Sequence, residues 1–254
     1  MKILITGHKG YIGSKLYATL SSDGHSITGI DLKSNDDLLT CEFPNIKFDV
    51  IIHLAGRSGV RESLKDPASY WMNNVEASRR LFERYPTTRI LYASSSSAYE
   101  PDLNPYAASK RVLEDLADRY PNTLGMRFHT VYSDRCPREN MFFNKLLNGT
   151  LEYTTRHYRD FVHLLDVINA IKLFLTKPKL KGIIDVGTGV PIKIQDLAPA
   201  LPVRLNTPGE REYTCADTNL IKSLGWKPKY SVEKFLTNNN KGNIITLFNG
   251  ETIT

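Results

Sequence analysis

A glycine-rich turn near the N-terminus constrains the fold more than any other feature of the chain. The segment from Thr6 to Gly13 has the sequence TGHKGYIG and follows the apolar run Ile3-Leu4-Ile5. Where a buried parallel strand turns sharply into a helix, the first N–H groups and the dipole of that helix face an anion. The pattern therefore predicts a strand, a phosphate-binding turn and a helix from about Tyr11 to Leu20.

The glycines of this turn have separate expected roles. Gly7 makes the tight bend, Gly10 lets the backbone approach the phosphates, and Gly13 lets the helix pack on the strand. The GxxGxxG spacing alone is equally compatible with an ordinary strand-to-helix turn. A second apolar strand ends in Asp31, where a carboxylate can accept both hydroxyls of an adenosine ribose and would repel a phosphate. This placement predicts a dinucleotide site that favours NAD over NADP, and the alternative is a solvated strand end.

Apolar strands alternate with helical patterns over most of the chain. The predicted strands are Lys2–Thr6, Ile27–Asp31, Asp49–Leu54, Arg89–Ala93, Thr123–Phe128 and Ile183–Val186. Longer helices are expected at Pro67–Tyr85, Pro105–Tyr120 and Leu164–Thr176. This alternation predicts an α/β fold, a Rossmann-type doubly wound parallel sheet with a smaller mixed α/β substrate lobe.

The pattern becomes irregular from about Pro137. Short helices are expected at Asn140–Leu147, Ile194–Leu201, Asp217–Leu224 and Ser231–Thr237, mixed with short strands. We expect residues 1–136 to form an NAD-binding Rossmann domain, to which residues 160–187 return. Residues 137–159 and 188–254 are expected to form the substrate-binding lobe, and 254 residues suffice for both.

Composition narrows the function classes. The net charge of +6 is spread along the chain without a basic run or interleaved aromatic residues, so no nucleic-acid partner is expected. Three widely spaced cysteines form no CxxC pair, which indicates neither disulfides nor a metal site and suits a reducing cytoplasm. No apolar run is long enough to span a bilayer, and the N-terminus enters a strand instead of a signal peptide. We therefore expect a cytoplasmic protein with no membrane partner.

A second motif, YAASK, runs from Tyr106 to Lys110 and opens a helix. Residues four apart share one helix face, so the Lys110 ammonium can lie near the Tyr106 phenol. A free tyrosine ionises at about pH 10, and a neighbouring positive charge lowers that pKa enough to make a phenolate base available. Four serines, Ser94 to Ser97, follow a predicted strand and place hydroxyl groups at the carboxyl edge of the sheet. Either motif alone occurs by chance, but their joint placement after the glycine-rich turn predicts hydride transfer.

At this point the chain resembles the extended short-chain dehydrogenases/reductases, which include the nucleotide-sugar epimerases and dehydratases. The resemblance covers nearly the whole sequence, and the motifs follow the family's order. They are TGHKGYIG, HLAG, SSSSAY, YAASK, RFHTVY, RDFVHLLD, DVGTG and ADTNLIKSLGWKP. Within the family, HLAGRSGVRESLKDPASYWMNN and the Arg-Glu-Asn-Met run from Arg138 look most like the UDP-glucuronate 4-epimerases. The resemblance implies NAD as cofactor and a nucleotide sugar, with UDP as the expected nucleotide, as substrate.

The resemblance also assigns residue roles. Tyr106 is implied as the catalytic base, Lys110 as its partner and ribose ligand, and Ser95, counted back from Tyr99, as the hydroxyl that bonds the reacting oxygen. The implied cofactor-binding residues are Gly7, Lys9, Gly10, Tyr11, Ile12, Gly13, Asp31, Asp37, Leu38, Leu54, Ala55, Gly56, Asn74, Tyr106 and Lys110. His53 and His129 are interpreted as core histidines without a catalytic role.

The implied substrate-binding residues are Arg61, Ser96, Ser97, Thr130, Arg138, Arg159 and Arg211. Related dehydratases carry acidic residues where this chain has Ser96 and Ser97, and a serine cannot act as a general acid at neutral pH. In uronate epimerases these positions bind the sugar carboxylate, helped by residues that match Thr130 and Arg138. Arg159 matches an arginine that clamps the nucleotide phosphates; the alternative for it is a surface pair with Asp160.

The resemblance implies a reversible oxidation of the sugar. The Tyr106 phenolate takes the proton from the hydroxyl at carbon 4 while hydride passes to NAD⁺, and hydride then returns to the other face of the 4-keto sugar. The helices at 67–85 and 105–120 resemble the pair that forms a homodimer interface in the family. Departures from the pattern are the short Tyr99–Tyr106 interval and Ser133-Asp134 in place of the usual Gly-Pro. Alternatives are a net nucleotide-sugar reductase and a catalytically silent NAD-binding protein.

Overall fold

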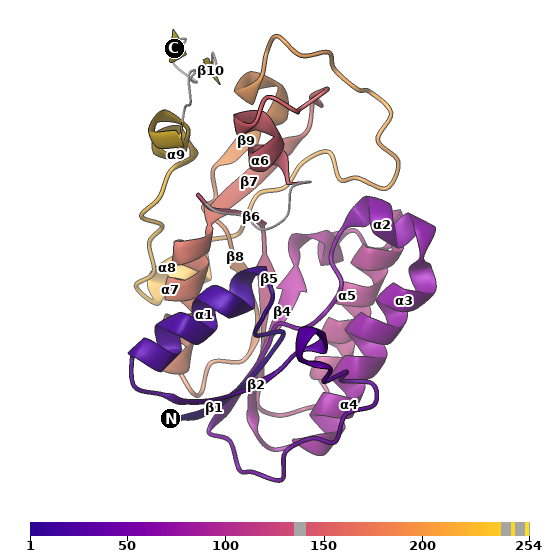
Figure 1. Ribbon diagram of the computed structural model, residues 1–254, viewed down its shortest axis with the longest axis vertical. Helices are drawn as coiled ribbons and strands as arrows, with labels where there is room; N and C mark the ends of the chain where they lie inside the picture. Colours follow the sequence, from indigo (N-terminus) through magenta and orange to yellow (C-terminus); the bar gives the residue numbers. More distant parts are fainter. Residues whose placement is uncertain (135–140, 240–244, 247–251, 254) are drawn as a thin grey trace. The chain divides into compact units, whose positions relative to one another are not determined.

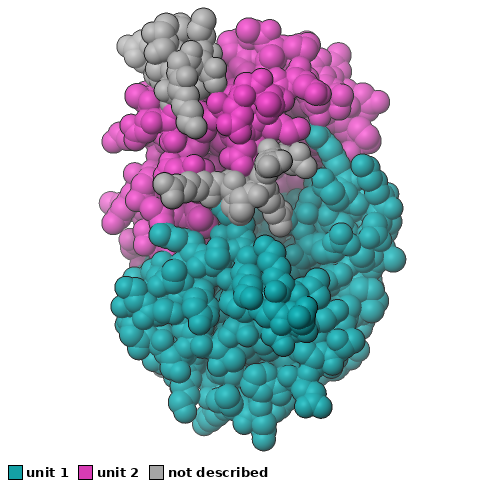
Figure 2. Space-filling model, viewed as in Figure 1, with its two compact units in different colours: residues 1–128, 171–184 teal, residues 129–170, 185–254 magenta. Residues whose placement is uncertain are grey.

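The protein divides into two compact units, shown in different colours in Figure 2. The structure is a computed structural model that describes residues 1–134, 141–239, 245–246 and 252–253. Unit 1 consists of Met1–Phe128 and Ile171–Ile184, and unit 2 of His129–Ala170 and Asp185–Thr254. The expected division of roles between an NAD-binding domain and a substrate lobe stays a prediction.

Unit 1 is built on a six-stranded sheet with the strand order β2-β1-β3-β4-β5-β8. Its strands are β1 (Lys2–Thr6), β2 (Ser26–Ile30), β3 (Val50–His53), β4 (Arg89–Ser95), β5 (Thr123–Phe128) and β8 (Gly182–Val186). The pairs from β2 through β5 are parallel. This arrangement confirms the predicted Rossmann-type α/β fold, with all six predicted strands present and their ends moved by no more than two residues.

Helices cover both faces of this sheet (Figure 1). Helix α1 (Tyr11–Ser22) lies on the same face as α7 (Leu164–Leu175), whose second half belongs to unit 1. The opposite face carries α3 (Pro67–Trp71), α4 (Ala77–Arg84) and α5 (Pro105–Ala117). Buried side chains from the sheet, such as Leu4 and Ile51, pack there against Leu81, Phe82 and Leu113. This core fixes the carboxyl ends of the strands, where the predicted site residues lie.

Two helical segments differ from the prediction. The helix expected at 67–85 is interrupted by a π-helical turn, η2 (Met72–Glu76), which contains the buried residue Asn74. A π turn inserts an extra residue and rotates the next helical turns around the axis, a local feature that helical periodicity does not reveal. A short helix, α2 (Val60–Lys65), had not been predicted, because six residues are too few to show a period.

Unit 2 contains a three-stranded sheet with the order β6-β7-β9. Strands β6 (Thr130–Tyr132) and β7 (Tyr158–His163) are parallel, whereas β9 (Pro191–Lys193) is antiparallel to β7. The helices are α6 (Phe142–Leu147), α8 (Asn219–Ser223) and α9 (Val232–Asn239), and β10 (Ile245–Thr246) pairs with β11 (Thr252–Ile253). The helix expected at 194–201 is only a 3₁₀ turn, η5 (Ile194–Leu197), because Pro199 lacks the N–H that a longer helix needs.

Candidate active site

The glycine-rich turn has the geometry of a phosphate cradle. Gly7 has φ +72° and donates its N–H to the Ile30 carbonyl (2.8 Å), which ties the ends of β1 and β2 together. A Cβ added at Gly13 would lie 2.0 Å from the Gly7 oxygen, so only glycine fits where α1 crosses the turn. Gly10 is the N-cap residue of α1, and no side chain in the described part of the chain caps that helix. The first turn of α1 is therefore built to receive an anion.

Asp31 lies at the end of β2 and is bound to the glycine-rich turn. Its carboxylate accepts the N–H of Lys9 (2.8 Å) and the N–H of Lys33 (2.9 Å), and the residue is 8% exposed. Each carboxylate oxygen keeps further acceptor capacity, so a ribose hydroxyl can still be bound. The two backbone donors hold the carboxylate in a fixed orientation, which supports the prediction for Asp31.

Two of the predicted cofactor-binding residues, Asp37 and Leu38, differ in their surroundings. The Leu38 side chain is buried in the core beside Leu81, so its apolar surface is already used there. Asp37 is half-buried, and its carboxylate accepts the Leu39 N–H (2.9 Å). Of this pair, only Asp37 keeps a polar group that could face a bound nucleotide.

The loop after β3 carries Leu54, Ala55 and Gly56, and it contacts both the glycine-rich turn and α5. A Cβ on Gly7 would lie 2.7 Å from the Ala55 nitrogen, and a Cβ on Gly56 would lie 3.5 Å from the Lys110 Nζ. The Asn74 amide accepts the Arg57 N–H (2.7 Å) and donates to the Arg57 carbonyl (3.0 Å) and to Ser109 (2.9 Å). Asn74 therefore holds this loop in place, and its amide is spent on the protein.

His53, at the end of β3, is a core histidine as predicted. Its Nδ1 lies 2.6 Å from Thr6 Oγ1 and its Nε2 lies 2.8 Å from Ser78 Oγ. The Ala55 N–H donates to the Thr6 hydroxyl, and Ser78 donates to the Asn74 carbonyl. The neutral tautomer with its proton on Nε2 therefore satisfies this row of hydrogen bonds, because Nε2 donates to Ser78 and Nδ1 accepts from Thr6. Burial, followed by the positive charge of Lys110, lowers the pKa of His53 to about 3. The imidazole is neutral at physiological pH.

Tyr106 and Lys110 lie one turn apart in α5. The N-cap residue Asn104 begins this helix by accepting the Ala107 N–H (2.8 Å), with Pro105 in the first turn. Lys110 is 5% exposed, and its ammonium donates to the Ala93 carbonyl in β4 (2.9 Å). Burial lowers the pKa of Lys110 to about 8. The structure therefore brings the YxxxK helix directly against the strand that leads to the serines.

The serine run has divided roles. Ser95 ends β4, and its hydroxyl accepts the Ser97 N–H (3.1 Å) as the N-cap of the 3₁₀ turn η3 (Ser96–Tyr99). Ser96 is buried and Ser97 is half-buried. Ser94 faces away from them and donates to Glu114 (2.5 Å). Of the four hydroxyls, the one on Ser94 is used to join β4 to α5.

A charged pair behind these residues had not been predicted. The buried Glu114 and the partly buried Arg127 form a two-pronged salt bridge, with Nε···Oε1 2.8 Å and Nη2···Oε2 2.7 Å. The Arg127 guanidinium also lies over the Tyr99 ring, 4.1 Å from its centre. The sequence signal was available, because Glu114 lies one turn beyond Lys110 on the same face of the helix.

The short interval between Tyr99 and Tyr106 is fully used for local structure. It consists of the 3₁₀ turn η4 (Pro101–Leu103) and the N-cap residue Asn104. Prolines at positions 101 and 105 fix the backbone where each element begins. This interval therefore leads directly from the serine turn into α5.

Two of the predicted substrate-binding arginines lie together in unit 2. The Arg159 guanidinium lies 3.1 Å from His157 Nδ1 and 3.6 Å from a Glu210 oxygen. Burial lowers the pKa of Arg159, Glu210 raises it, and the positive charge of the nearby Arg211 lowers it further. His157 and Glu210 had not been predicted. His157 lies only two residues before Arg159, whereas Glu210 reaches it because the 210–214 segment runs beside β7.

The alternative interpretation of Arg159, a surface pair with Asp160, is wrong. Asp160 is fully buried, and its carboxylate accepts four hydrogen bonds of 2.7 to 2.9 Å. The donors are the N–H and hydroxyl of Thr188 and the N–H groups of Gly189 and Ala216. Asp160 thus joins β7 to two loops and leaves Arg159 to other partners.

The remaining predicted substrate residues that the structure describes belong to different units. Arg61 is exposed on α2 in unit 1, and Thr130 is half-buried at the start of β6 in unit 2. Arg138 lies outside the described residues. Neither the contact of these residues with a sugar nor their grouping is tested by the structure, and their roles stay predictions.

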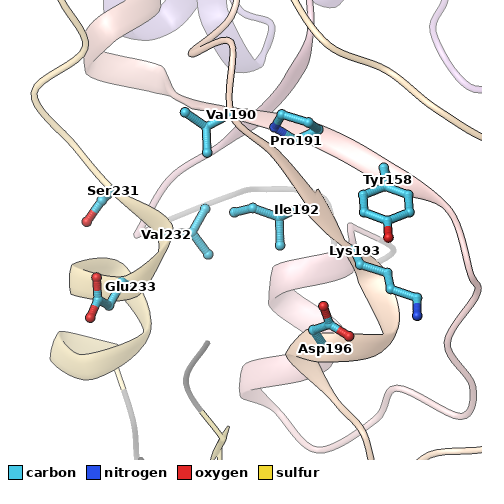
Figure 3. Close-up of a pocket in the computed structure, with 9 residues that line it drawn as sticks. All are labelled: Tyr158, Val190, Pro191, Ile192, Lys193, Asp196, Ser231, Val232 and Glu233. Atoms are coloured by element: carbon cyan, nitrogen blue, oxygen red, sulfur yellow. The ribbon is translucent and has the colours of Figure 1, made fainter. Parts of the chain in front are cut away.

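Unit 2 also contains a pocket of about 330 Å³ between β9 and the start of α9 (Figure 3). Ile192 and Val232 lie next to each other in it, and Lys193 and Glu233 line its sides. None of the predicted site residues that the structure describes lines this pocket. We therefore do not assign it to the candidate active site.

Three further features concern membrane-spanning helices, metal ligands and cysteines. Among the described residues, no helix is long and apolar enough to cross a membrane. Within the same ranges, no group of three or more histidine, cysteine or acidic residues is arranged to hold a metal ion. Cys41 and Cys215 are free thiols.

Comparison with known proteins identifies the family. The model of the NAD dependent epimerase/dehydratase family matches residues 3–187. The chain belongs to this family. Membership confirms the predicted resemblance and makes the protein an NAD-dependent nucleotide-sugar enzyme.

Individual members of the family are distant relatives. Protein CapI of Staphylococcus aureus is 25% identical over 319 aligned positions, which cover 92% of this chain and 95% of that one. The UDP-glucuronate 4-epimerase of Thermodesulfobacterium geofontis is 26% identical over 302 positions, with 92% and 93% coverage. The solved structure of MoeE5 in complex with UDP-glucuronic acid and NAD is 27% identical, covers 91% and 95%, and has a TM-score of 0.76.

The residues of unit 1 fit the family's cofactor, NAD. The space that a Cβ at Gly7 or Gly13 would fill is closed by backbone, while the first turn of α1 has no side-chain cap. Asp31, at the end of β2, keeps acceptor capacity for a hydroxyl group, and Lys110 stands beside Gly56. When bound, NAD⁺ supplies the acceptor for a hydride. The cofactor prediction is thus confirmed at the level of the family.

Proposed function

We propose that the protein is an NAD-dependent nucleotide-sugar 4-epimerase that acts through a transient 4-keto sugar, with a UDP-hexuronate or UDP-hexose as substrate. The observation that carries this proposal is the hydrogen bond from the Lys110 ammonium to the Ala93 carbonyl. It joins the helix that holds Tyr106 to the strand that ends in Ser95, so that base, ammonium and hydroxyl share one edge of the sheet.

Tyr106 is the proposed base. Its phenolate removes the proton from the sugar hydroxyl at carbon 4, and the Lys110 ammonium one turn away stabilises the negative charge on the phenolate. The Ser95 hydroxyl donates a hydrogen bond to the reacting oxygen while the sugar is oxidised. When the reaction reverses, Tyr106 returns the proton to the same oxygen, and the hydride returns to the opposite face of carbon 4.

Ser96 and Ser97 disfavour elimination of water as the outcome. A dehydratase needs a general acid beside the leaving hydroxyl, and a serine does not donate a proton at neutral pH. Small hydroxyl side chains leave room for a keto sugar to turn over, and they can bind a sugar carboxylate. This choice of residues supports epimerisation, and a hexuronate in particular.

Arg159 and Arg211 are proposed to bind the nucleotide diphosphate. The guanidinium of Arg159 is held by His157 and Glu210, so its orientation is set before a ligand binds. Arg138 and Thr130 are proposed to bind the sugar. An enzyme of this kind must hold the nucleotide firmly and the sugar loosely, because the sugar has to expose both faces of one carbon.

The relatives are consistent with a UDP-sugar substrate. MoeE5 is a relative whose solved complexes contain UDP-glucuronic acid or UDP-glucose together with NAD. The alignment with CapI spans 319 positions, more than the 254 residues of this chain, so that relative has segments that are missing here. A shortened chain of this kind supports a more open sugar pocket, which keeps hexoses among the candidate substrates.

We further propose a homodimer in which helices α3, α4 and α5 contribute the interface, and action in a reducing cytoplasm. Light scattering of the purified protein measures the dimer directly. A mass equal to that of one chain at micromolar concentration would remove the homodimer from the proposal.

The function is tested by NMR of the purified protein mixed separately with UDP-glucuronate, UDP-glucose and UDP-N-acetylglucosamine, without added cofactor. The expected result is appearance of the carbon 4 epimer of one of them. Tyr106→Phe should reduce the rate by about 10² to 10⁴-fold, the range for loss of a general base. Tyr120→Phe, just beyond the end of α5, is the matched control and should keep the rate of the unaltered enzyme.

A second outcome separates the alternatives. Turnover that needs added NADH or NADPH in stoichiometric amounts would indicate a net reductase instead of an epimerase. Binding of NAD without turnover of any of the three sugars would contradict the proposed substrates and favour a silent NAD-binding protein.

A further inference from the structure

Glu114 is a buried charged residue that the proposed mechanism does not use. It is 1% exposed and lies one helical turn beyond Lys110 and two turns beyond Tyr106 in α5. Side chains four apart in a helix share a face, so these three ionisable groups form a row along one side of α5. A carboxylate removed from water is costly unless donors and opposite charge surround it.

The donors to Glu114 come from two neighbouring strands. Ser94 in β4 donates its hydroxyl to Oε1 (2.5 Å), and Arg127 in β5 donates to both oxygens. Ser94 and Arg127 are directly opposite each other in the register of the two strands. A two-pronged guanidinium contact fixes direction as well as distance. The Glu114 carboxylate therefore clamps α5 to β4 and β5 at a single point.

This clamp lies next to Ser95 in the sequence and in space. The two residues before Ser95 are Ala93 and Ser94. The Ala93 carbonyl accepts a hydrogen bond from the Lys110 ammonium, and the Ser94 hydroxyl donates one to Glu114. On its other side, the η3 turn ends at Tyr99, whose ring lies under the Arg127 guanidinium. The strand end that presents Ser95 is thus held from both directions by groups connected to Glu114.

The charges around Lys110 make Glu114 its principal negative neighbour. The ionisable groups facing it are Tyr106 and Glu114 on α5 and His53 on β3, with Arg127 behind Glu114. His53 is neutral, because burial and Lys110 lower its pKa to about 3. Burial lowers the pKa of Lys110 to about 8, and the charge of Glu114 opposes that decrease.

We propose that Glu114 is a positioning residue of the active site: it holds the strand end that carries Ser95 and stabilises the positive charge of Lys110. The roles of Ser95, Tyr106 and Lys110 in this statement rest on the proposed function. The contacts of Glu114 do not, so the first test needs neither a sugar nor turnover.

The first test follows the titration of Lys110 by NMR of protein with ¹³C-labelled lysine. The signal that disappears in Lys110→Met identifies the residue, and its midpoint in the unaltered protein is expected at about pH 8. Glu114→Gln should lower this midpoint by about one pH unit, the order expected for loss of one charge a helical turn away. Asp115→Asn, the next acidic residue of α5 and exposed beside Arg111, should leave it unchanged.

A second variant moves the midpoint in the opposite direction. Arg127→Gln removes the positive partner and leaves the charge of Glu114 uncompensated, so the Lys110 midpoint should rise. This variant decides the question if Glu114→Gln does not fold. A midpoint that stays within 0.2 pH units, an order-of-magnitude limit on what one charge could do, in either folded variant overturns the charge role of Glu114.

The pH profile of turnover tests the consequence for catalysis. Activity requires protonated Lys110, so its alkaline limb should move to lower pH in Glu114→Gln by the same amount as the NMR midpoint. Glu114→Asp keeps the charge and should restore the position of that limb while turnover stays reduced, because the shorter carboxylate cannot hold both strands. A merely structural role would lower the whole profile without moving it. If no sugar is turned over by the unaltered enzyme, the proposed function fails, and the NMR titration still decides the role of Glu114.

Discussion

Substitution of Gly13 by alanine tests whether the glycine-rich turn is limited by backbone contact. The added Cβ would lie 2.0 Å from the Gly7 oxygen and 2.8 Å from the Gly7 carbon. Both atoms belong to the backbone, so no side chain can rotate away, and either α1 or the turn must move by about 1.4 Å to restore ordinary contact. Overpacking of this kind costs about 1 to 3 kcal/mol.

The net effect on stability is the difference between two opposing contributions. Alanine in a helix is favoured over glycine by about 1 kcal/mol, which offsets part of the overpacking. Because the contact is with backbone, we place the overpacking at the upper end of its range and expect a net loss of about 2 kcal/mol. For a chain of this size that corresponds to a decrease in Tm of about 4 to 8 °C. NAD affinity should fall at least about tenfold, since the displaced carbonyl lies in the cradle itself.

Thermal unfolding and calorimetric titration with NAD measure the two effects. Ser14→Ala, the next residue of α1 and exposed, is the matched control and should change neither quantity. Gly10→Ala is a graded control, because its Cβ would lie 3.0 Å from the Gly7 oxygen; it should weaken NAD binding with little change in Tm. If Gly13→Ala matched Ser14→Ala in both Tm and NAD affinity, the reasoning about backbone contact would be refuted.

Three other outcomes are expected. Asp31→Ala leaves the Lys9 N–H without its acceptor and removes the proposed ribose ligand. The ratio of the NADP dissociation constant to the NAD dissociation constant, measured by titration, should fall at least about tenfold. An unchanged ratio would contradict the role proposed for Asp31. The pKa of His53 is lowered to about 3 in the folded protein, so the unfolded chain binds more protons below pH 6.5 and stability falls on acidification. Urea unfolding at pH 6.5 and at pH 4 should show that the loss of stability between these two pH values is about 3 kcal/mol smaller in His53→Gln than in the unaltered protein. Equal losses in the two proteins would exclude the effect. The pKa of Lys110 is lowered to about 8, so this side chain should make the protein more stable by about 1.5 kcal/mol between pH 8 and pH 9.5. If the stability of Lys110→Met rose as much over this range as that of the unaltered protein, the result would argue against a buried ammonium.

Several features of the fold were predictable from local sequence. The turn from β1 into α1 was predictable because Gly7 has a positive φ and Gly13 packs against the backbone of Gly7. Both properties concern residues that are close in the chain. Tyr106 and Lys110 could be placed on one face of α5 from their spacing alone. His53 was correctly assigned to the core, since it ends an apolar strand.

Other features depended on contacts between distant residues. The π-helical turn at Met72–Glu76 was missed because Asn74 meets its partners Arg57 and Ser109 only in the folded chain. The alternative interpretation of Arg159, a surface pair with Asp160, is wrong because Asp160 accepts bonds from residues at positions 188, 189 and 216. Successive side chains of a strand point to opposite faces of the sheet, so the side chains of Arg159 and Asp160 in β7 point apart.

The sequence by itself determined the family, the glycine-rich turn from β1 into α1 and the spacing of the Tyr106–Lys110 pair, because each depends on residues within a few positions of one another. Only the tertiary structure showed what surrounds that pair. The Glu114–Arg127 salt bridge and the bond from Lys110 to the Ala93 carbonyl join α5 to β5 and β4, and His53 on β3 is neutral. The physical reason is that charge stabilisation inside a protein depends on distance and burial, which are fixed only when strands and helices far apart in the chain pack together.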